Sequence, residues 1–500
     1  MKTSNLIAII LLLTVSILPT FVSAEVLFID TPFQEMEFDQ NRPLPKAWSA
    51  CYPSCDDENK IDVNLMNKGE NFFSIEQLQF IEEDFFEAKT IDNTENVELL
   101  FQLKNGLTHP VTRLSYRISK SSHKLELKIS SSKPITIKIR ANKMLLPEDI
   151  VGLGGLYNGT SLISFSPKGI EEMKHKTIQN HSEKLWHGAR SRFWSFLISP
   201  GDTIQSYSIQ EIDPNSNAFA LASNSESGEY HFIFYLGPIE RSALMRVSSQ
   251  LKHLLYTALW DWLRWICFGF QMILSWVFTW VGNLGISIIL LALIIKILLY
   301  PLSNVAERWQ QEVNAIQAWL QPRLKKIKTN YTGEEAHQRT LALYQEKGIS
   351  TMFTVKSLAG LLIQIPIFIA VFDMLGESIM LKGQGFLWIN DLSRPDQWMN
   401  LPFVIPYFGG TFNLLPLLMM VITALSAHIF KDKHLQGDLL KQQQIKLYLM
   451  ALAFFILFYT FPAGMVLYWT ASNSLQLIKA LVVKYKTQKR RPSKLGLFDG

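Results

Sequence analysis

The chain has 500 residues, of which 48% are hydrophobic and 18% charged, and its formal net charge is +5. This length accommodates two or three domains, and parts of the chain are too apolar for a purely soluble protein. No basic, aromatic-interleaved surface stands out in the polar first half, so nucleic acid is not an expected partner there.

The N-terminus predicts a targeting or anchoring segment. Residues 1–24 combine Lys2 with an apolar run at 6–18 and a small-residue cleavage pattern, Val-Ser-Ala, at 22–24. The run is only slightly short for a membrane span, so the segment is either a cleaved signal peptide, which we favour, or a first transmembrane helix. Both alternatives predict that the following residues are exported.

Residues 25–250 are expected to form an exported β-sandwich. Apolar residues alternate strictly in three runs: Leu114, Tyr116, Ile118; Leu125, Leu127, Ile129; and Ile135, Ile137, Ile139. Alternation with a period of two, interrupted by turn residues, is typical of half-buried antiparallel strands. Asn105-Gly106 adds a hairpin signal. Several short strands of this kind favour a sandwich.

The exported half shows no catalytic constellation, so we do not expect an enzyme, and GLGG at 152–155 lacks the spacing of a phosphate loop. Cys51 and Cys55 are candidates for a small disulfide loop. Their spacing also suits a metal, but no histidine lies nearby, and neither a metal nor a cofactor is expected. The aromatic and arginine-rich residues 185–196 could line a ligand groove or pack in a core with stacked arginines.

From residue 251 the sequence becomes markedly apolar. Residues 251–268 place leucines and tryptophans on one helical face and predict an amphipathic helix at a membrane surface. A transmembrane core is then expected at 276–483, with five spans at about 276–302, 358–375, 414–429, 445–461 and 465–483.

Lysines and arginines predict the orientation of these spans. They crowd residues 303–357 and the tail 484–500, whereas 377–401 holds few. The tail and 303–357 are therefore expected in the cytoplasm, and 25–250 in the periplasm. Within 303–357, helically spaced apolar residues and a capping box at 332–335 predict a helical hairpin. Its apolar stripes either dock a partner or pack on each other.

Several motifs between about 276 and 476 resemble the YidC/Oxa1/Alb3 family of membrane-protein insertases. They read GNLGISII (282–289), YPL (300–302), LQP (320–322), LLIQIPIF (361–368), FLWINDLS (386–393) and FPAGMVLYWTASNSLQ (461–476). The β domain ending in FYLGP (234–238) is similar to the bacterial YidC members.

The resemblance implies a polytopic α-helical protein of the bacterial inner membrane, with a five-helix core, an exported β-sandwich and a cytoplasmic hairpin. It implies a non-enzymatic insertase and chaperone for inner-membrane proteins, working alone or with the Sec translocon. Nascent membrane proteins and lipids are the implied partners. The hairpin and basic tail are candidates to contact the ribosome and the signal recognition machinery. No nucleic acid is expected as a partner beyond that of the ribosome.

Lys296 lies inside the apolar run LIIKILLYPLS (293–303). An ionisable group within a span is costly and usually faces a wet cavity or a partner. Its long stem could also snorkel to the membrane surface near Ser303. The resemblance places Lys296 where the family usually has an arginine facing a hydrophilic groove. Lysine keeps the charge but loses the bidentate fork, and Ala292 on the same face replaces a hydroxyl found in some relatives.

The resemblance and helical spacing together give the other groove candidates: Gln364, Ser357, Tyr468, Trp469, Thr470, Asn473 and Gln476. Phe368 is expected beside the path by which a client segment slides into lipid. The same polar residues could instead join helices through hydrogen bonds. A small-solute transporter is the alternative function, but the internal repeats it predicts are not evident. A membrane-tethered periplasmic binding protein or chaperone is a third.

Overall fold

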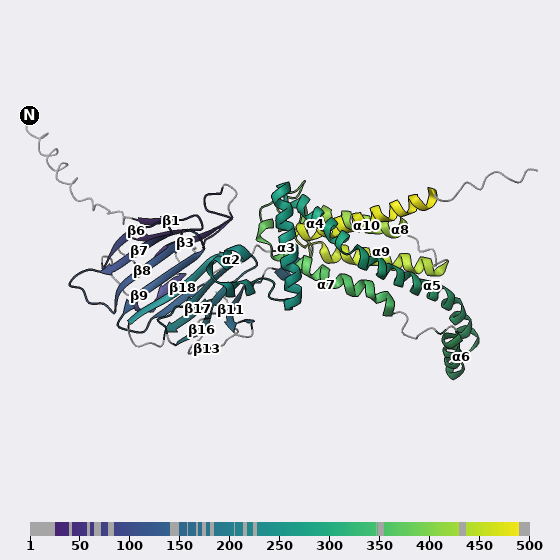
Figure 1. Ribbon diagram of the computed structural model, residues 1–500, viewed down its shortest axis with the longest axis horizontal. Coiled ribbons are helices and arrows are strands. Elements are labelled where there is room, and N and C mark those ends of the chain that lie inside the picture. The colour runs from purple at the N-terminus through teal and green to yellow at the C-terminus, as the bar shows by residue number, and fades with distance from the viewer. Residues whose placement is uncertain are drawn as a thin grey trace, which may run out of the picture. The chain divides into compact units, whose positions relative to one another are not determined.

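The computed structural model describes most of the chain after residue 25, and Figure 1 draws it as a ribbon. The described residues are 26–39, 43–57, 61–64, 72–78, 85–140, 150–157, 159–166, 169–172, 177–180, 185–204, 206–213, 218–223, 228–346, 348, 355–429 and 437–489. The expected signal-like segment 1–24 and the end of the basic tail lie outside these residues. The chain divides into two units: unit 1 comprises Met1–Met144, Lys174–Trp186 and Leu197–Leu236, and unit 2 the remainder.

Unit 1 is built from antiparallel strands. One sheet has the order β1-β2-β3-β4, with β1 at Val26–Asp30, β2 at Gln34–Asp39, β3 at Pro45–Tyr52 and β4 at Ile61–Asn64. A second has the order β13-β16-β17-β10-β5, at Thr177–Asn180, Tyr207–Asp213, Ala218–Ser223, Thr136–Arg140 and Phe73–Ile75. A third group has the order β18-β9-β8-β7-β6, at Gly228–Pro238, Lys124–Ser131, Val111–Ser119, Asn96–Leu103 and Phe86–Asp92.

The alternating runs form strands whose apolar side chains share one buried face. Leu114 pairs with Ile129 and Tyr116 with Leu127, and all four side chains are almost fully buried. Phe38 of β2 packs 5.0 Å from the Tyr116 ring, so the first sheet contributes to the same aromatic core. The predicted β-rich domain is confirmed. Of the expected range 25–250, residues 145–173, 187–196 and 237–250 cluster with unit 2.

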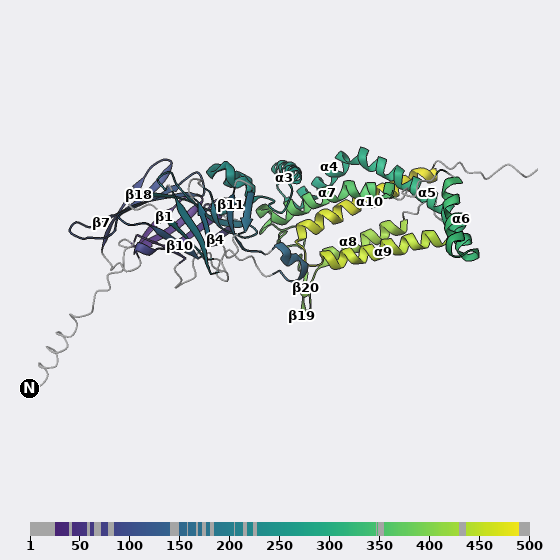
Figure 2. The same ribbon diagram turned by 90° about the horizontal axis from the view of Figure 1, so that it is seen from below.

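Unit 2 contains the helices. They are α2 (Arg241–Val247), α3 (Asp261–Val281), α4 (Leu284–Leu298), α5 (Tyr300–Asn330), α6 (Gly333–Glu346), α7 (Val355–Glu377), α8 (Leu414–Ile429), α9 (Asp438–Phe458) and α10 (Ala463–Lys489). Its strands are β11 (Ser161–Ser166), β12 (Gly169–Glu172), β14 (His187–Arg190), β19 (Met399–Ile405) and β20 (Gly409–Phe412); β15 (Trp194–Pro200) is shared between units. Helix α10 packs against α4, α7 and α8 (Figure 2).

Two expected helices have other boundaries. The range 251–268 is not one helix, since a 3₁₀ turn ends at Leu254 and α3 begins only at Asp261. The range 276–302 is divided as well. Gly282 ends α3 in the left-handed conformation at φ 68°, and the Asn283 side chain caps α4 by accepting from the Ile286 N–H. Capping chemistry therefore overrides the continuous apolar pattern.

Among the described residues, no single helix has both the length and the apolar composition required of a membrane span. Helices α4 and α5 meet the criterion together, although the chain bends by 63° between them. Helix α8 is apolar but shorter.

The predicted helical hairpin is present as α5 and α6, and it has a core of its own. Val313, Leu320 and Leu343 are buried, and Trp319 and Tyr344 pack against them. The apolar stripes of the two helices are thus used, at least in part, against each other. That leaves the charged face of α5 exposed, including Arg323, Lys325, Lys326 and Lys328.

The glycines at 152–155 lie in a 3₁₀ segment, η3 (Gly152–Tyr157), which packs closely on the chain after α9. The Gly154 N–H donates to Thr460 Oγ1 at 3.0 Å. A Cβ on Gly154 would lie 1.9 Å from the Thr460 carbonyl oxygen. The glycine therefore permits a close backbone approach, a structural role that fits the absence of a phosphate-loop pattern.

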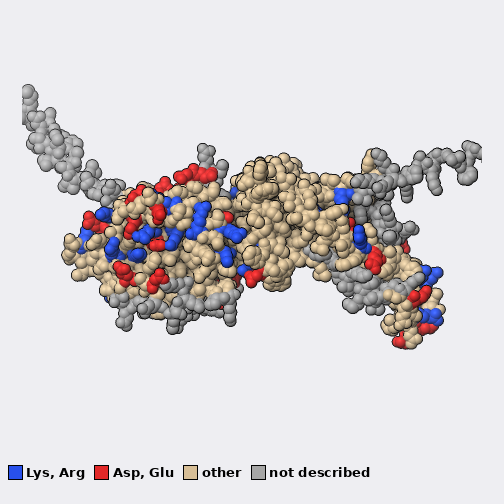
Figure 3. Space-filling model, in the orientation of Figure 1, with Lys and Arg blue, Asp and Glu red and all other residues tan. Residues whose placement is uncertain are grey.

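Charged side chains are unevenly distributed over the surface. Figure 3 shows acidic and basic residues scattered over the strands of unit 1 and gathered again on the α5–α6 hairpin. Much of the remaining helical surface of unit 2 carries no charge on the face drawn. Helix α3 has exposed tryptophans, among them Trp265 and Trp280.

Candidate functional site

Lys296 lies in the last turn of α4, immediately before the bend into α5, and its side chain is partly buried. Two charged groups act on its ammonium, those of Lys479 on α10 and Glu307 on α5. These two form an ion pair, with Lys479 Nζ 2.6 Å from Glu307 Oε1. Among the described residues no carboxylate lies within ion-pair distance of Lys296. The site therefore combines two lysines with one glutamate.

Trp469 and Phe368 meet in an aromatic cluster. The two ring centroids are 4.8 Å apart, and Phe372 of α7 with Phe454 and Phe458 of α9 complete the cluster. The Trp469 Nε1 is buried and has no hydrogen-bond partner among the described residues. Trp469 thus faces α7 and α9. The cluster is apolar except for that one donor.

Asn473 and Gln476 both line a small cavity. It has a volume of about 230 Å³ and is lined by α10 together with Thr423, Ser426 and Ala427 of α8 and Leu447 of α9. Asn473 Nδ2 donates to Thr423 Oγ1 at 2.8 Å. This bond joins two helices, as the alternative of interhelical hydrogen bonding predicts. Lys296 does not line the cavity.

The remaining groove candidates are dispersed. Gln364 of α7 has an exposed side chain, while Tyr468 and Thr470 of α10 are buried. The Thr470 hydroxyl donates within its own helix to the Val466 carbonyl at 2.7 Å. Ser357 lies in α7, but its side chain is outside the described residues. The described contacts thus place the candidates in three groups: Lys296 with the Lys479–Glu307 pair, Trp469 with Phe368, and Asn473 with Gln476.

Lys296 is not the one ionisable residue within the expected spans. Asp373 lies inside 358–375 and is only partly exposed. One turn later on α7, Glu377 accepts from the Tyr256 N–H at 3.1 Å and lies 3.4 Å from Arg190 Nη2. The sequence alone could have identified this further ionisable position, because Asp373 is a negative group within an apolar segment.

The arginine-rich residues 185–196 pack in the protein interior. Arg192 is buried, stacks 4.4 Å from the centre of the Phe193 ring and donates to the Gly376 carbonyl at 2.6 Å. A second bond from Arg192 reaches the Ser393 carbonyl at 2.9 Å. Among the two alternatives, this geometry favours core packing. It holds the end of α7 to the segment that follows it.

The cysteines take separate roles. Cys51 and Cys55 form a disulfide with a Cα–Cα distance of 5.0 Å, and Cys267 is free and buried. Glu35 lies near the disulfide. Because both sulfur atoms are bonded to each other, that group offers no thiolate to a metal.

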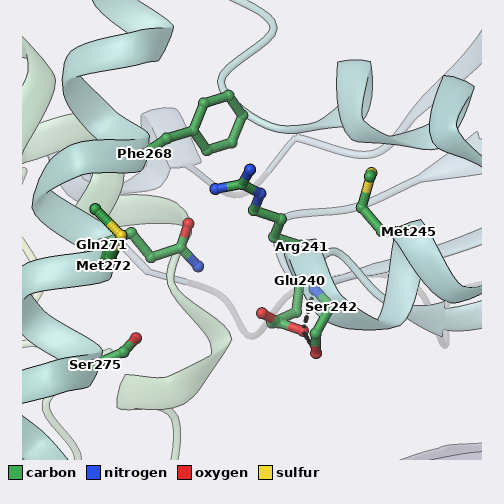
Figure 4. Close-up of a pocket in the computed structure, with 8 residues that line it drawn as sticks. All are labelled: Glu240, Arg241, Ser242, Met245, Phe268, Gln271, Met272 and Ser275. Atoms are coloured by element: carbon green, nitrogen blue, oxygen red, sulfur yellow. Dashed lines mark hydrogen bonds between the residues drawn. The ribbon is translucent and has the colours of Figure 1, made fainter.

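A larger open cavity, of about 430 Å³, lies between α2 and α3 (Figure 4). The Arg241 guanidinium extends over the Phe268 ring, 4.9 Å from its centre, and Met245 and Met272 flank it. Glu240 turns away to cap α2, accepting from the N–H groups of Ser242 and Ala243. Among the described residues that line this cavity, none is a groove candidate.

The comparisons with known proteins agree with the motifs. Residues 276–490 match the sequence model of the 60Kd inner membrane protein family. The family resemblance is confirmed. A YidC membrane protein insertase of Syntrophobacter fumaroxidans is 32% identical over 52% of this chain and 45% of its own length. One of Chlorobium luteolum is 27% identical over 63% of this chain and 54% of its own.

This chain thus spans about half the length of the curated relatives it matches. A crystal structure of an active YidC insertase with its first transmembrane domain resolved covers 96% of this chain and is itself covered to 98%. Its sequence identity is 18% and its TM-score 0.36.

Proposed function

We propose that the protein is a non-enzymatic insertase that moves segments of membrane proteins into the bacterial inner membrane and helps them fold. The observation that carries the proposal is the family match at residues 276–490, which includes α4, α5 and α7–α10. The uncharged helical surface of unit 2 supports it, because apolar surface of this kind is stable beside lipid. In this proposal the basic segments face the cytoplasm, and unit 1 the periplasm.

Lys296 has the role of attracting acidic residues of an incoming segment. A lysine inside an apolar helix retains its charge only beside polar groups or water, and the Lys479–Glu307 pair supplies polar neighbours. Because Glu307 is bonded to Lys479, the carboxylate of a client is the natural partner for Lys296. Attraction of this kind requires charge but no bidentate geometry, so a lysine suffices.

The three groups of residues have separate roles in insertion. The polar flank of a client enters near Lys296, where partial hydration lowers the cost of removing it from water. Asn473 and Gln476 offer further hydrogen-bonding groups. The apolar part passes Phe368, Tyr468 and Trp469 into lipid, since aromatic faces accept varied apolar side chains.

The α5–α6 hairpin delivers clients through its charged face. Its apolar residues pack in its own core, which leaves the exposed basic residues of α5 to contact the ribosome or the signal recognition machinery. Phosphate-rich partners suit such a surface. Cooperation with the Sec translocon is part of the same proposal.

The test is replacement of the protein in depleted cells by variants of Lys296. Lys296→Glu should abolish insertion of a single-span client with an acidic exported tail, and Lys296→Ala should reduce it. Lys296→Arg should remain active, and Lys479→Arg is the matched control that keeps the neighbouring ion pair. Full insertion by Lys296→Glu would remove the proposed role of the charge. Crosslinking from position 296 or 469 to stalled nascent chains tests the route itself.

A further inference from the structure

The β19–β20 hairpin and α8 lie in one stretch of the chain that carries no charged side chain. No aspartate, glutamate, lysine or arginine occurs between Asp396 and Lys431. Within this stretch β19 and β20 pair antiparallel, and α8 follows after a single residue, Asn413. The hairpin therefore continues directly into an apolar helix.

The base of the hairpin is fixed to the helices of unit 2. Asn413 Nδ2 donates to the Tyr459 carbonyl at 2.7 Å, and Tyr459 Oη donates to the Thr411 carbonyl at 3.0 Å. The Phe408 ring, in the turn between the two strands, also lies 5.0 Å from that of Tyr459. Since Tyr459 directly follows α9, the helices determine the direction in which the hairpin points.

Part of the hairpin, in β19 and at the Tyr407 side chain, is exposed and apolar. Phe403 is 60% exposed, Val404 75% and Tyr407 83%. Figure 2 shows the hairpin projecting to the side of α8 and α9 instead of extending along them. A two-stranded ribbon with such exposed apolar side chains has marginal stability in water and is prone to associate with other strands.

We infer that this hairpin inserts the exposed side chains of β19 and Tyr407 into the lipid–water interface of the bilayer. It carries no charge that would select a protein partner, and its aromatic side chains are the kind enriched at that depth. The unpaired strand edges keep it out of the hydrocarbon centre, where open edges are not tolerated. The inference rests on the proposed membrane location of α8 and adds a lateral anchor beside that helix.

The experiment measures the depth of an environment-sensitive fluorophore attached at Val404→Cys in the full chain. The native cysteines are a disulfide and a buried thiol, and the unsubstituted chain gives the labelling background. The protein is placed in nanodiscs of phosphatidylcholine and phosphatidylglycerol that contain doxyl-labelled lipid. We expect quenching roughly twofold stronger from doxyl groups near the headgroup than from those near the chain end.

Two further labels separate this inference from the proposed function. Leu449→Cys, 61% exposed on α9, should be quenched because α9 is expected in the membrane. Asn105→Cys, in an exposed turn of unit 1, should not be quenched. Quenching at 449 without quenching at 404, as when a protein covers the hairpin, would overturn the inference and leave the membrane core intact. Absence at both sites would overturn both, and equal quenching at 105 would also contradict the inference.

Discussion

Unit 1 and unit 2 differ in where they place charged and large apolar side chains. In unit 1 the large rings of Phe101 and Tyr116 are buried, and ion pairs such as Lys120–Asp92 lie at the surface. In unit 2 Arg192 is buried, whereas Trp265 is 75% exposed. Apolar burial dominates in water, and exposed apolar surface with internal polar contacts is typical of proteins in lipid. The two units therefore distribute charged and apolar side chains differently.

The largest expected effect tests the apolar core of unit 1. Phe101→Ala should lower the free energy of unfolding of unit 1 by about 3–5 kcal/mol, because it removes a fully buried ring and leaves a cavity. Thermal unfolding of the full chain, followed by near-ultraviolet circular dichroism, measures the change. Insertion by the helices should continue at the permissive temperature. A parallel loss of insertion would show that the two units depend on each other.

Arg192 tests the opposite arrangement, a buried charge in unit 2. Arg192→Ala should destabilise the end of α7 by about 3 kcal/mol, because two carbonyls lose a charge-assisted donor. Proteolysis near residue 377 and client insertion are the measurements. Arg241→Ala is the control, since that guanidinium is exposed and its described contact is with Phe268. Equal effects from the two variants would contradict the prediction.

A buried histidine makes part of the stability depend on pH. Burial lowers the pKa of His187 to about 4, whereas the unfolded side chain has a pKa near its usual 6.5. The unfolded chain therefore binds the proton more tightly, and stability, complete above pH 6.5, decreases as the pH falls towards 4. The expected slope is roughly 1.4 kcal/mol per pH unit.

Thermal denaturation at several pH values measures this slope, and His187→Asn is the matched variant. Asparagine places an amide atom near the position of Nδ1, which lies 2.8 Å from the Ser164 hydroxyl, but it does not titrate. The slope between pH 6.5 and 4 should therefore flatten. An unchanged slope would assign the pH dependence to other groups.

The smallest effect on stability is expected for an ion pair whose two side chains are both exposed. Arg339 donates to Glu335 Oε1 from Nε at 3.1 Å and from Nη2 at 2.9 Å on the surface of α6. Arg339→Ala should cost about 0.5 kcal/mol or less, and salt should reduce that cost. Amide hydrogen exchange in α6 at low and high salt gives the value. A cost above that of Arg192→Ala would reverse the ranking.

The strands of unit 1 were predictable from the sequence, because strict alternation of apolar and polar residues suits a half-buried strand and does not suit a helix. Leu114 and Tyr116 show it directly. The same reasoning failed at Gly282, where an apolar run appeared continuous while two capping residues divided it. Local backbone preference decided that boundary, and hydrophobicity could not reveal it.

Within the site, spacing along one helix identified residues but not their neighbours. Asn473 and Gln476 do share a cavity, yet Trp469 on the same helix faces an aromatic cluster. Glu307 and Lys479 were missed because they are 172 residues apart in the chain. Helix packing brings them together, and no single-helix pattern predicts such a meeting.

The contact between Gly154 and Thr460 is expected to couple the evolution of the two positions. Their segments are 306 residues apart in sequence, yet a side chain at 154 would require the backbone at 460 to move. The two positions are therefore expected to change in concert among relatives, with any larger residue at 154 accompanied by a rebuilt turn after α9. Chimaeras that exchange only one of the two segments between distant relatives should assemble poorly.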